Sequence, residues 1–268
     1  MMHPSMKSDF NDPELAKVLE YFLKFNGFEH QAAQTLRRAL DEVIDGMRTG
    51  RWSVDSLEKT EKTYIGTKVE ILFKFEFELE SGTKLDFVIE GSEVDIKCTV
   101  LRDWMIPQEA IGELCLLVKI DDAKSKFSIG LIRADLEVLR TGKNRDRKSS
   151  ISAEGKKSVC WLVEDGGLPV NFLATLDSEV RLKIFQHESS GQKRVNELFR
   201  LVQRRLIPRV ALETVARQKD PMKRVRDARK ALAEEGILIL GHQNSDPQTA
   251  REKGVPVPQK GEFISVER

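Results

Sequence analysis

The 268-residue sequence lacks several features that define special classes of protein. Its 44 Lys and Arg residues nearly balance its 43 Asp and Glu residues, so the net charge is +1 and no whole-chain field can hold a polyanion. It has no run of about 18 apolar residues, and no apolar stretch follows a basic start at the N-terminus. We therefore expect a soluble cytoplasmic protein that is neither exported nor membrane-bound.

Cysteine is also scarce. The three cysteines, Cys98, Cys115 and Cys160, lie far apart and form no Cys-x-x-Cys pair, which argues against a disulfide framework and fits a reducing compartment. Hydrophobic residues make up 40% of the chain. That content excludes a mainly disordered protein, and the length predicts roughly one or two domains.

The near-neutral total conceals an uneven distribution of charge. Residues 1–165 contain 25 basic and 30 acidic residues, a net charge of −5, whereas residues 166–268 contain 19 and 13, a net charge of +6. The excess is densest over residues 193–230, where 13 basic residues face 4 acidic ones. Such a patch is typical of a nucleic-acid-binding surface, although a solvated helix face explains a basic run equally well.

The first part of the chain predicts a mixed α/β domain. Residues 12–47 show two amphipathic helical patterns, and residues 56–67 look helical with Glu70 at the end of that segment. Apolar and polar residues then alternate over residues 71–79, the period of a half-buried strand. Further strands are predicted at 84–89, 94–100, 114–120 and 127–132, and a helix at 152–163. Gly166-Gly167-Leu168-Pro169 predicts a linker at 166–170, which separates domains at 1–165 and 171–268.

The second part predicts a mostly helical domain. Helical patterns cover residues 176–185, 195–206, 208–217 and 221–233, and Asp220 before Pro221 is a suitable N-cap. A helix, a tight turn and a second, basic helix form the pattern of a helix-turn-helix, and a strand at 237–240 could pair with 263–266 as a wing. An ordinary helical hairpin with a basic surface explains the same pattern.

An acidic and lysine constellation lies on the predicted strands. Asp95 and Lys97 are two residues apart and share one face of a strand, and Asp86 lies on the neighbouring strand. Carboxylates at this spacing can hold Mg²⁺, which suits phosphodiester cleavage, while the lysine orients or deprotonates the attacking water. Glu70 could complete the metal shell. An exposed cross-strand salt pair accounts for the same residues, and we interpret the nearby Glu93 as solvated.

The order Glu70, Asp86, Asp95, Lys97 resembles the catalytic core of PD-(D/E)xK nucleases, and more closely the NaeI family of type IIE restriction endonucleases. Leu85 stands where the motif's name has proline, a residue that ligates nothing. The resemblance extends from about Leu36 to Val266 and is carried by these segments: Arg48-Thr49-Gly50-Arg51-Trp52, Val69-Glu70-Ile71, Val94-Asp95-Ile96-Lys97, Trp104-Met105-Ile106-Pro107, Asn144-Arg145-Asp146, Arg194-Val195-Asn196-Glu197-Leu198-Phe199-Arg200, Met222-Lys223-Arg224-Val225-Arg226 and Val255-Pro256-Val257-Pro258.

This resemblance implies a restriction-endonuclease-like mixed sheet flanked by helices, followed by a winged helix-turn-helix domain. It also implies a homodimer that binds two double-stranded DNA sites, one of them as effector. Glu70, Asp86, Asp95 and Lys97 match the family's catalytic positions. With them we expect Mg²⁺ at Glu70, Asp86 and Asp95, and water positioning by Lys97.

Candidate DNA contacts are the basic and amide residues near these motifs, because Arg and Lys bind phosphate and Arg reads guanine edges. They are Arg48, Arg51, Lys143, Asn144, Arg145, Lys193, Arg194, Lys223, Arg224 and Arg226. Two other functions fit the same residues. One is a non-catalytic DNA-binding regulator, and the other is a nicking repair or topoisomerase-like enzyme on the same scaffold.

Overall fold

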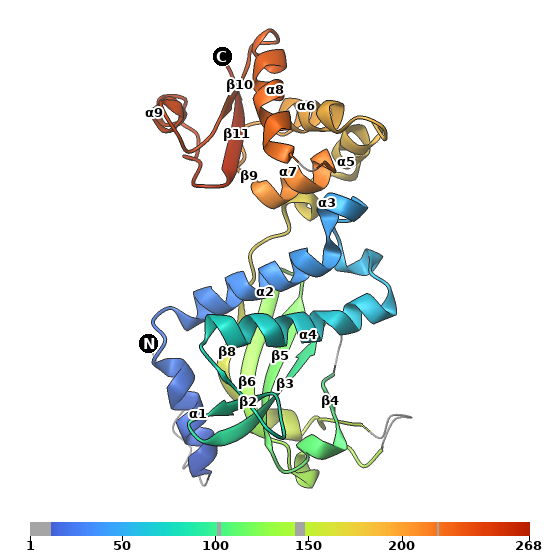
Figure 1. The fold of residues 1–268 in the computed structure, drawn as a ribbon, viewed down its shortest axis with the longest axis vertical. Helices are drawn as coiled ribbons and strands as arrows, with labels where there is room; N and C mark the ends of the chain where they lie inside the picture. Colours follow the sequence, from blue (N-terminus) through green and yellow to red (C-terminus); the bar gives the residue numbers. More distant parts are fainter. Residues whose placement is uncertain (1–11, 101–102, 143–147, 219) are drawn as a thin grey trace. The chain divides into compact units, whose positions relative to one another are not determined.

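The structure is a computed structural model that describes residues 12–100, 103–142, 148–218 and 220–268 (Figure 1). The chain forms two compact units. The first contains the chain up to Val43 together with Glu58–Pro169, and the second contains Ile44–Leu57 and Val170–Arg268. Within the described residues, every helix is too short or too polar to cross a membrane.

Two N-terminal helices confirm the pattern predicted for residues 12–47. They are α1 (Pro13–Leu23) and α2 (Phe28–Ile44). Asp12 caps α1 by accepting a hydrogen bond from the Leu15 backbone N–H at 3.0 Å, and Pro13 occupies a position where its missing N–H costs nothing. The apolar face of α1 is buried.

The centre of the first unit is a six-stranded sheet with the order β1-β2-β3-β5-β6-β8. Its strands are β1 (Glu80–Ser81), β2 (Phe87–Ile89), β3 (Ser92–Thr99), β5 (Leu114–Asp121), β6 (Lys126–Arg133) and β8 (Cys160–Gly167). Strands β3 and β5 are parallel and the other neighbours are antiparallel. The sheet is therefore mixed, and the strands predicted at 94–100, 114–120 and 127–132 are confirmed. A small separate pair joins β4 (Met105–Ile106) to β7 (Ser149–Ser150).

Helix α4 (Lys59–Glu76) confirms a helix over most of residues 56–67 and continues through most of the strand predicted at 71–79. The strand prediction at 71–79 is wrong because the buried residues Ile65, Val69, Leu72 and Phe73 follow helical spacing, whereas Phe75 is exposed. A capping box between Glu58 and Glu61 starts the helix. Glu70 consequently lies in the second half of a long helix.

The helix predicted at 152–163 is also wrong. A short 3₁₀ turn at Gly155–Ser158 leads directly into β8, which pairs with β6. The predicted linker differs as well, because Gly166 and Gly167 end β8 and pair with Phe127 and Lys126. The boundary between the units falls after Pro169.

Helices cover one face of the sheet, and an irregular layer covers the other (Figure 1). On the helix side, a Cβ added to Gly66 of α4 would lie 4.0 Å from the Cβ of Cys98 on β3. On the opposite side, the indole of Trp104 donates to the Val118 carbonyl at 2.8 Å and packs in a cluster with Cys115, Leu117 and Ile132. Successive residues of β3 therefore point alternately toward the helices and toward the layer that contains Trp104.

Ion pairs hold the helices to the sheet. The buried Arg37 of α2 contacts Asp122 at 2.6 Å and Asp41 at 2.8 Å. Arg133 of β6 contacts Asp12 at the start of α1 at 2.6 Å. Because burial raises the pKa of Asp41 while Arg37 opposes the rise, the arginine compensates a carboxylate that burial alone would destabilise.

The second unit combines helices with a three-stranded antiparallel sheet of order β10-β11-β9. Its helices are α3 (Gly46–Thr49), α5 (Ser178–Phe185), α6 (Gly191–Leu201), α7 (Arg209–Ala216), α8 (Pro221–Ala233) and α9 (Asp246–Glu252). Its strands are β9 (Ile207–Pro208), β10 (Ile237–Leu240) and β11 (Glu262–Glu267). The predicted pairing of 237–240 with 263–266 is confirmed by the β10–β11 register.

Residues 44–57 belong to this second unit although they precede most of the first unit in sequence. The ring of Trp52 stacks on Phe185 at 4.9 Å, and the Asn171 side-chain amide donates to the Trp52 carbonyl. Gly46 packs so closely on α7 that an added Cβ would collide with Oγ1 of Thr214. A domain boundary drawn at residue 165 of the sequence cannot show that residues 44–57 belong to the second unit.

Replacing Gly46 by Ala should destabilise the second unit. The new Cβ would also lie 2.7 Å from the Arg51 carbonyl oxygen, and overpacking of this kind typically costs about 1–3 kcal/mol. Thermal unfolding measures the effect. Gly167→Ala is the control, because nothing lies within 4 Å of its added Cβ. Equal melting temperatures for the two variants would contradict the assignment of residues 44–57 to this core.

Candidate active site and nucleic-acid interface

Strand β3 presents Asp95 and Lys97 on one face. The Lys97 Nζ lies 2.6 Å from Oδ2 of Asp95, and the Asp95 side chain is only 6% exposed. In the parallel register, Asp95 is opposite Cys115 of β5, so both residues face the layer that contains Trp104. The prediction that Asp95 and Lys97 share a strand face, with Cys98 on the other, agrees with this geometry.

Asp86 converges on the same point from the turn before β2. Its Oδ2 accepts a hydrogen bond from the Ile96 backbone N–H at 2.8 Å and lies 4.0 Å from Nζ of Lys97. The Lys97 ammonium therefore faces both carboxylates. Because the bond to Ile96 is made by the backbone, it fixes the Asp86 carboxylate against β3 whatever residue occupies position 96.

Glu93 shapes the turn that carries Asp86, contrary to its interpretation as a solvated residue. Its carboxylate accepts hydrogen bonds from the backbone N–H groups of Thr83 and Leu85, each at 2.9 Å, and of Lys84 at 3.2 Å. It also accepts one from the Thr83 hydroxyl at 2.6 Å. These bonds lower the pKa of Glu93 to about 2, the Thr83 hydroxyl contributing most. The sequence holds no signal for this role, because a carboxylate next to a turn is usually solvated.

Glu70 reaches the electrostatic neighbourhood of the cluster from α4. Its pKa is raised first by burial and then by the negative charge of Asp86, while Lys97 acts in the opposite direction. The structure thus brings three of the four predicted residues, Asp86, Asp95 and Lys97, together. Glu70 interacts with Asp86 and Lys97 by longer-range electrostatics, and among the described residues it does not form a three-carboxylate metal group with the two aspartates.

Burial dominates the ionisation of Asp95. It raises the pKa of this carboxyl to about 6, although the hydrogen bond and charge of Lys97 act to lower it, and Asp86 adds to the rise. Because burial and the neighbouring Asp86 both disfavour the negative charge of Asp95, a cation bound beside the two carboxylates would stabilise that charge.

The donor set fits a magnesium ion held partly by water. Among the described residues, no three His, Cys, Asp or Glu side chains are grouped closely enough to enclose a metal. Mg²⁺ commonly binds through one or two carboxylates and keeps several waters or substrate phosphate oxygens. Asp86 and Asp95 supply two hard oxygen ligands, and burial of Asp95 favours charge compensation there. Both carboxylates therefore suit the ion, with open positions remaining for water or phosphate.

A second group of candidate residues lies on the second unit. Arg48 and Arg51 belong to the segment 44–57 and therefore sit on this unit, not with the nuclease-like sheet. Arg217, at the end of α7, has positive φ, and its guanidinium lies against Gly50, where an added Cβ would be 3.0 Å from its Nε. Arg217 thus shares one unit with Arg48 and Arg51, which lie far from it in the sequence.

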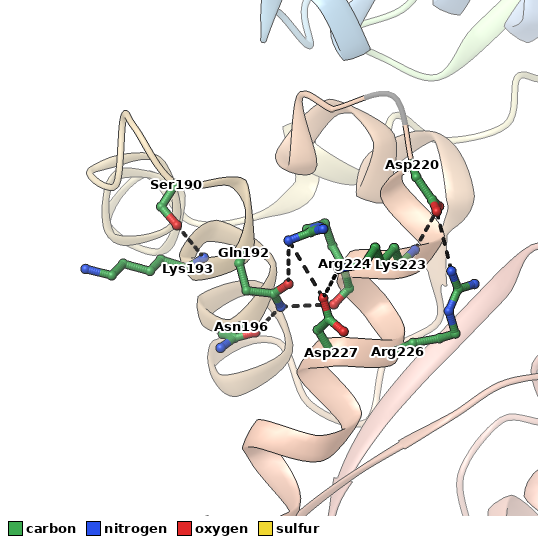
Figure 2. Close-up of polar contacts among 9 residues, drawn as sticks. All are labelled: Ser190, Gln192, Lys193, Asn196, Asp220, Lys223, Arg224, Arg226 and Asp227. Atoms are coloured by element: carbon green, nitrogen blue, oxygen red, sulfur yellow. Dashed lines mark hydrogen bonds and ion pairs between the residues drawn. The ribbon is translucent and has the colours of Figure 1, made fainter.

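Helices α6 and α8 present the basic residues that sequence analysis singled out. Figure 2 shows Gln192 of α6 facing Arg224 of α8: its amide donates to the Arg224 carbonyl at 3.0 Å, and its oxygen accepts from Arg224 Nη1 at 3.4 Å. Lys223 and Arg226, with side chains 53% and 63% exposed, are more accessible than Arg224 at 21%. Lys193 is exposed on α6. Asp220 caps α8 as predicted, accepting from the Lys223 backbone N–H at 2.9 Å.

Arg194 has a structural position, which corrects its prediction as a DNA contact. It is 4% exposed and donates to the carbonyl oxygens of Val215 at 2.6 Å and Ala216 at 3.0 Å, and also to those of His187 and Glu188. Its guanidinium is buried and makes four hydrogen bonds to backbone carbonyls, which hold it inside the unit and away from a phosphate. Lys143, Asn144 and Arg145 lie outside the described residues.

A mixed sheet flanked by helices, with two carboxylates and a lysine converging on one strand, is consistent with a nuclease. The sequence comparisons specify which. The chain belongs to the restriction endonuclease NaeI family, whose sequence model matches residues 16–268. It is 42% identical over 264 residues to the type II restriction enzyme NaeI of Lentzea aerocolonigenes, which covers 95% of this chain and 83% of the relative. The suggested resemblance is confirmed, and the chain is a restriction endonuclease.

The raised pKa of Asp95 predicts a specific dependence of stability on pH. Because its folded pKa of about 6 exceeds the ordinary aspartate value of 3.8, the folded state binds a proton that the unfolded state releases, and Asp95 reduces stability as pH rises from 4 to 6. The full effect is roughly 3 kcal/mol at neutral pH. Asp95→Asn should remove this dependence, measured by urea unfolding in chelator-containing buffer. Parallel pH profiles for the wild type and the variant would show that Asp95 does not titrate in this way.

Proposed function

We propose that the chain is a Mg²⁺-dependent type II endonuclease that hydrolyses double-stranded DNA at the cluster of Asp86, Asp95 and Lys97. The observation that carries the proposal is the convergence of both carboxylates on the Lys97 ammonium, at 2.6 and 4.0 Å. Membership of a restriction endonuclease family supports phosphodiester bonds of DNA as the substrate.

In this proposal the acidic residues bind the metal ion and the lysine positions the water. When bound, Mg²⁺ supplies a Lewis acid that polarises the scissile phosphate and stabilises the leaving oxygen. Asp86 and Asp95 would hold it, and Glu70 would assist through a bound water. The hydrogen bond from Ile96 keeps Asp86 in place for this role.

Lys97 is suited to positioning the attacking water. An ammonium has three donors and no acceptor, and in this structure it contacts Asp95 and the Ile96 carbonyl oxygen at 3.3 Å. A donor released from these partners can hold a water or a phosphate oxygen. Fixing the nucleophile beside the phosphorus lowers the entropic part of the barrier.

The second unit would bind DNA as a winged helix-turn-helix. Helices α7 and α8 with the turn between them correspond to the paired helices, and the β10–β11 antiparallel pair to the wing. In this arrangement Lys223 and Arg226 at the start of α8 meet DNA, and Lys193, Arg48, Arg51 and Arg224 support the contact. We also propose that the protein acts as a homodimer with two DNA sites, one as effector.

Replacing Asp95 by Ala should abolish cleavage and leave DNA binding nearly unchanged. Loss of a ligand that stabilises the transition state is expected to cost about 10³-fold or more in rate. Linearisation of plasmid DNA in Mg²⁺ measures cleavage, and a gel shift in Ca²⁺ measures binding. Glu90→Gln is the matched control, since Glu90 belongs to the same hairpin and its ion pair with Lys24 is long, at 3.8 Å. An Asp95→Ala enzyme that still cuts would refute the assigned site.

Replacing Arg226 by Ala should weaken DNA binding at every sequence and lower the slope of log K against log salt by about 1, because one phosphate contact releases about one counterion. Fluorescence anisotropy over a range of salt concentrations gives the slope. Arg205→Ala is the control, because Arg205 is engaged by Thr175 at 2.7 Å and by the Phe172 ring. An unchanged slope for Arg226→Ala would assign this residue to a solvated helix face.

A further inference from the structure

Residues 82–86 form the turn between β1 and β2, and Asp86 is the last residue of that turn. The carboxylate of Glu93 on β3 accepts hydrogen bonds from three successive backbone N–H groups of the turn: those of Thr83, Lys84 and Leu85. The Thr83 hydroxyl donates a fourth hydrogen bond to it. Consecutive N–H groups that converge in this way form an anion-binding concavity, and here the anion is a side chain of the same chain. We call these four hydrogen bonds the Glu93 clamp.

Gly82 allows the turn to approach the Glu93 carboxylate closely. A Cβ added at position 82 would lie 2.5 Å from Oε2 of Glu93 and 2.3 Å from the Leu85 carbonyl oxygen. Both distances are too short for a stable contact, so any larger residue would displace the carboxylate or the turn. The turn and the Glu93 side chain are therefore fitted to each other.

Glu93 lies on the same face of β3 as the two site residues of that strand. Glu93, Asp95 and Lys97 occupy alternate positions, so their side chains leave the strand on one side. Asp86 reaches the site from another segment, and two attachments to β3 fix it there. One is the Glu93 clamp on its turn, and the other is the 2.8 Å hydrogen bond from the Ile96 N–H to its carboxylate.

The clamp also shows that Glu93 acts on the site indirectly. Its Oε1 accepts three of the four hydrogen bonds and its Oε2 accepts the fourth, so both oxygens face the turn. In the part of the chain that the structure describes, Glu93 does not combine with Asp86 and Asp95 into a group of three acidic side chains able to hold a metal. Its effect on the site therefore passes through the turn.

We propose that Glu93 is a positioning residue that sets the affinity of the site for its divalent ion by holding Asp86 in its binding position. This inference rests on the proposed function, in which Asp86 and Asp95 hold that ion. A turn held in place before the ion arrives takes no binding energy from the ion, whereas a free turn lowers the apparent affinity by the fraction of time it is misplaced. Leu85 fits the same account, because a proline at its position would have no N–H to donate to Glu93.

The first test measures binding of Mn²⁺ to the full chain from the electron paramagnetic resonance signal of the free ion, without turnover. Loss of a group that orients a metal ligand commonly costs about 10- to 100-fold in affinity, so Glu93→Ala should raise the Mn²⁺ Kd by at least about 10-fold. Glu93→Gln keeps one acceptor oxygen and should raise it by about 3-fold or more.

Glu113→Gln is the matched control for the Mn²⁺ measurement. Glu113 pairs with the Lys84 ammonium on the same turn, so this variant removes an equal charge and leaves the clamp intact. Its Mn²⁺ Kd should stay within about 2-fold of wild type, as expected for an exposed ion pair. Glu93→Ala that binds Mn²⁺ as wild type does, or Glu93→Gln that binds it as Glu113→Gln does, would overturn the proposal.

The second test reads the clamp itself by amide hydrogen exchange in the absence of metal. The amides of residues 83–85 should exchange at least about 10-fold faster in Glu93→Gln than in wild type, because their acceptor is lost or weakened. In Glu113→Gln they should exchange at the wild-type rate. Equal exchange in Glu93→Gln and wild type would overturn the clamp.

The third test isolates the Leu85 N–H. Leu85→Pro removes this donor together with the side chain, whereas Leu85→Ala removes the side chain alone. Leu85→Pro should therefore bind Mn²⁺ more weakly than Leu85→Ala, and the difference should disappear when Glu93 is already alanine, because the donor then has no acceptor to lose. Equal Mn²⁺ affinities for the two Leu85 variants with Glu93 present would contradict the role of this N–H.

Asp86→Ala separates this inference from the proposed function. If both hold, Asp86→Ala abolishes the Mn²⁺ binding that Glu93→Ala weakens, and combining the two changes adds nothing further. Mn²⁺ binding that survives in Asp86→Ala would refute the proposed function, because the ion would then be held elsewhere. Mn²⁺ binding that is lost in Asp86→Ala but unchanged in Glu93→Ala would refute the positioning role of Glu93 alone.

Discussion

The hydrogen bond from the Ile96 backbone N–H to the Asp86 carboxylate is the constraint on which the candidate site depends. It ties the turn before β2 to the middle of β3, where the strand alternation already places Asp95 and Lys97 side by side. Glu93 holds the preceding turn by accepting three backbone N–H bonds. The acidic cluster is thus built from backbone geometry, and the lysine compensates the charge that this geometry gathers.

Strand alternation explains why the core of the site was predictable from sequence. Asp95 and Lys97 face one side of β3 while Val94 and Ile96 occupy the helix side, and no tertiary information is needed to see this. The strand predicted just after Glu70 is wrong because sequence alternation alone did not show which residues are buried. Ile71, Phe73, Phe75 and Phe77 alternate like a strand, but Phe75 is exposed and the buried set has helical spacing. Exposed apolar residues on one face of the helix therefore imitated the period of a strand.

Contacts between distant segments account for the remaining differences. Residues 44–57 join the second unit through Gly46 and Trp52, so Arg48 and Arg51 change neighbours although their sequence positions suggest the first unit. Arg194 and Arg226 belong to the same basic run, yet one satisfies carbonyls inside the unit and the other is exposed. Charge density locates such a surface in the sequence. It does not distinguish arginines that support the fold from those that face solvent.

The central claim is that Asp86 and Asp95 hold the divalent ion required for cleavage. Anomalous diffraction from crystals of the protein with uncut DNA and Mn²⁺ tests it most directly, because the ion is located independently of activity. The account predicts an anomalous peak at about 2.0–2.3 Å from oxygens of both carboxylates, beside a DNA phosphate. A peak bound to other residues, or none near Asp86 and Asp95 at saturating Mn²⁺, would contradict it.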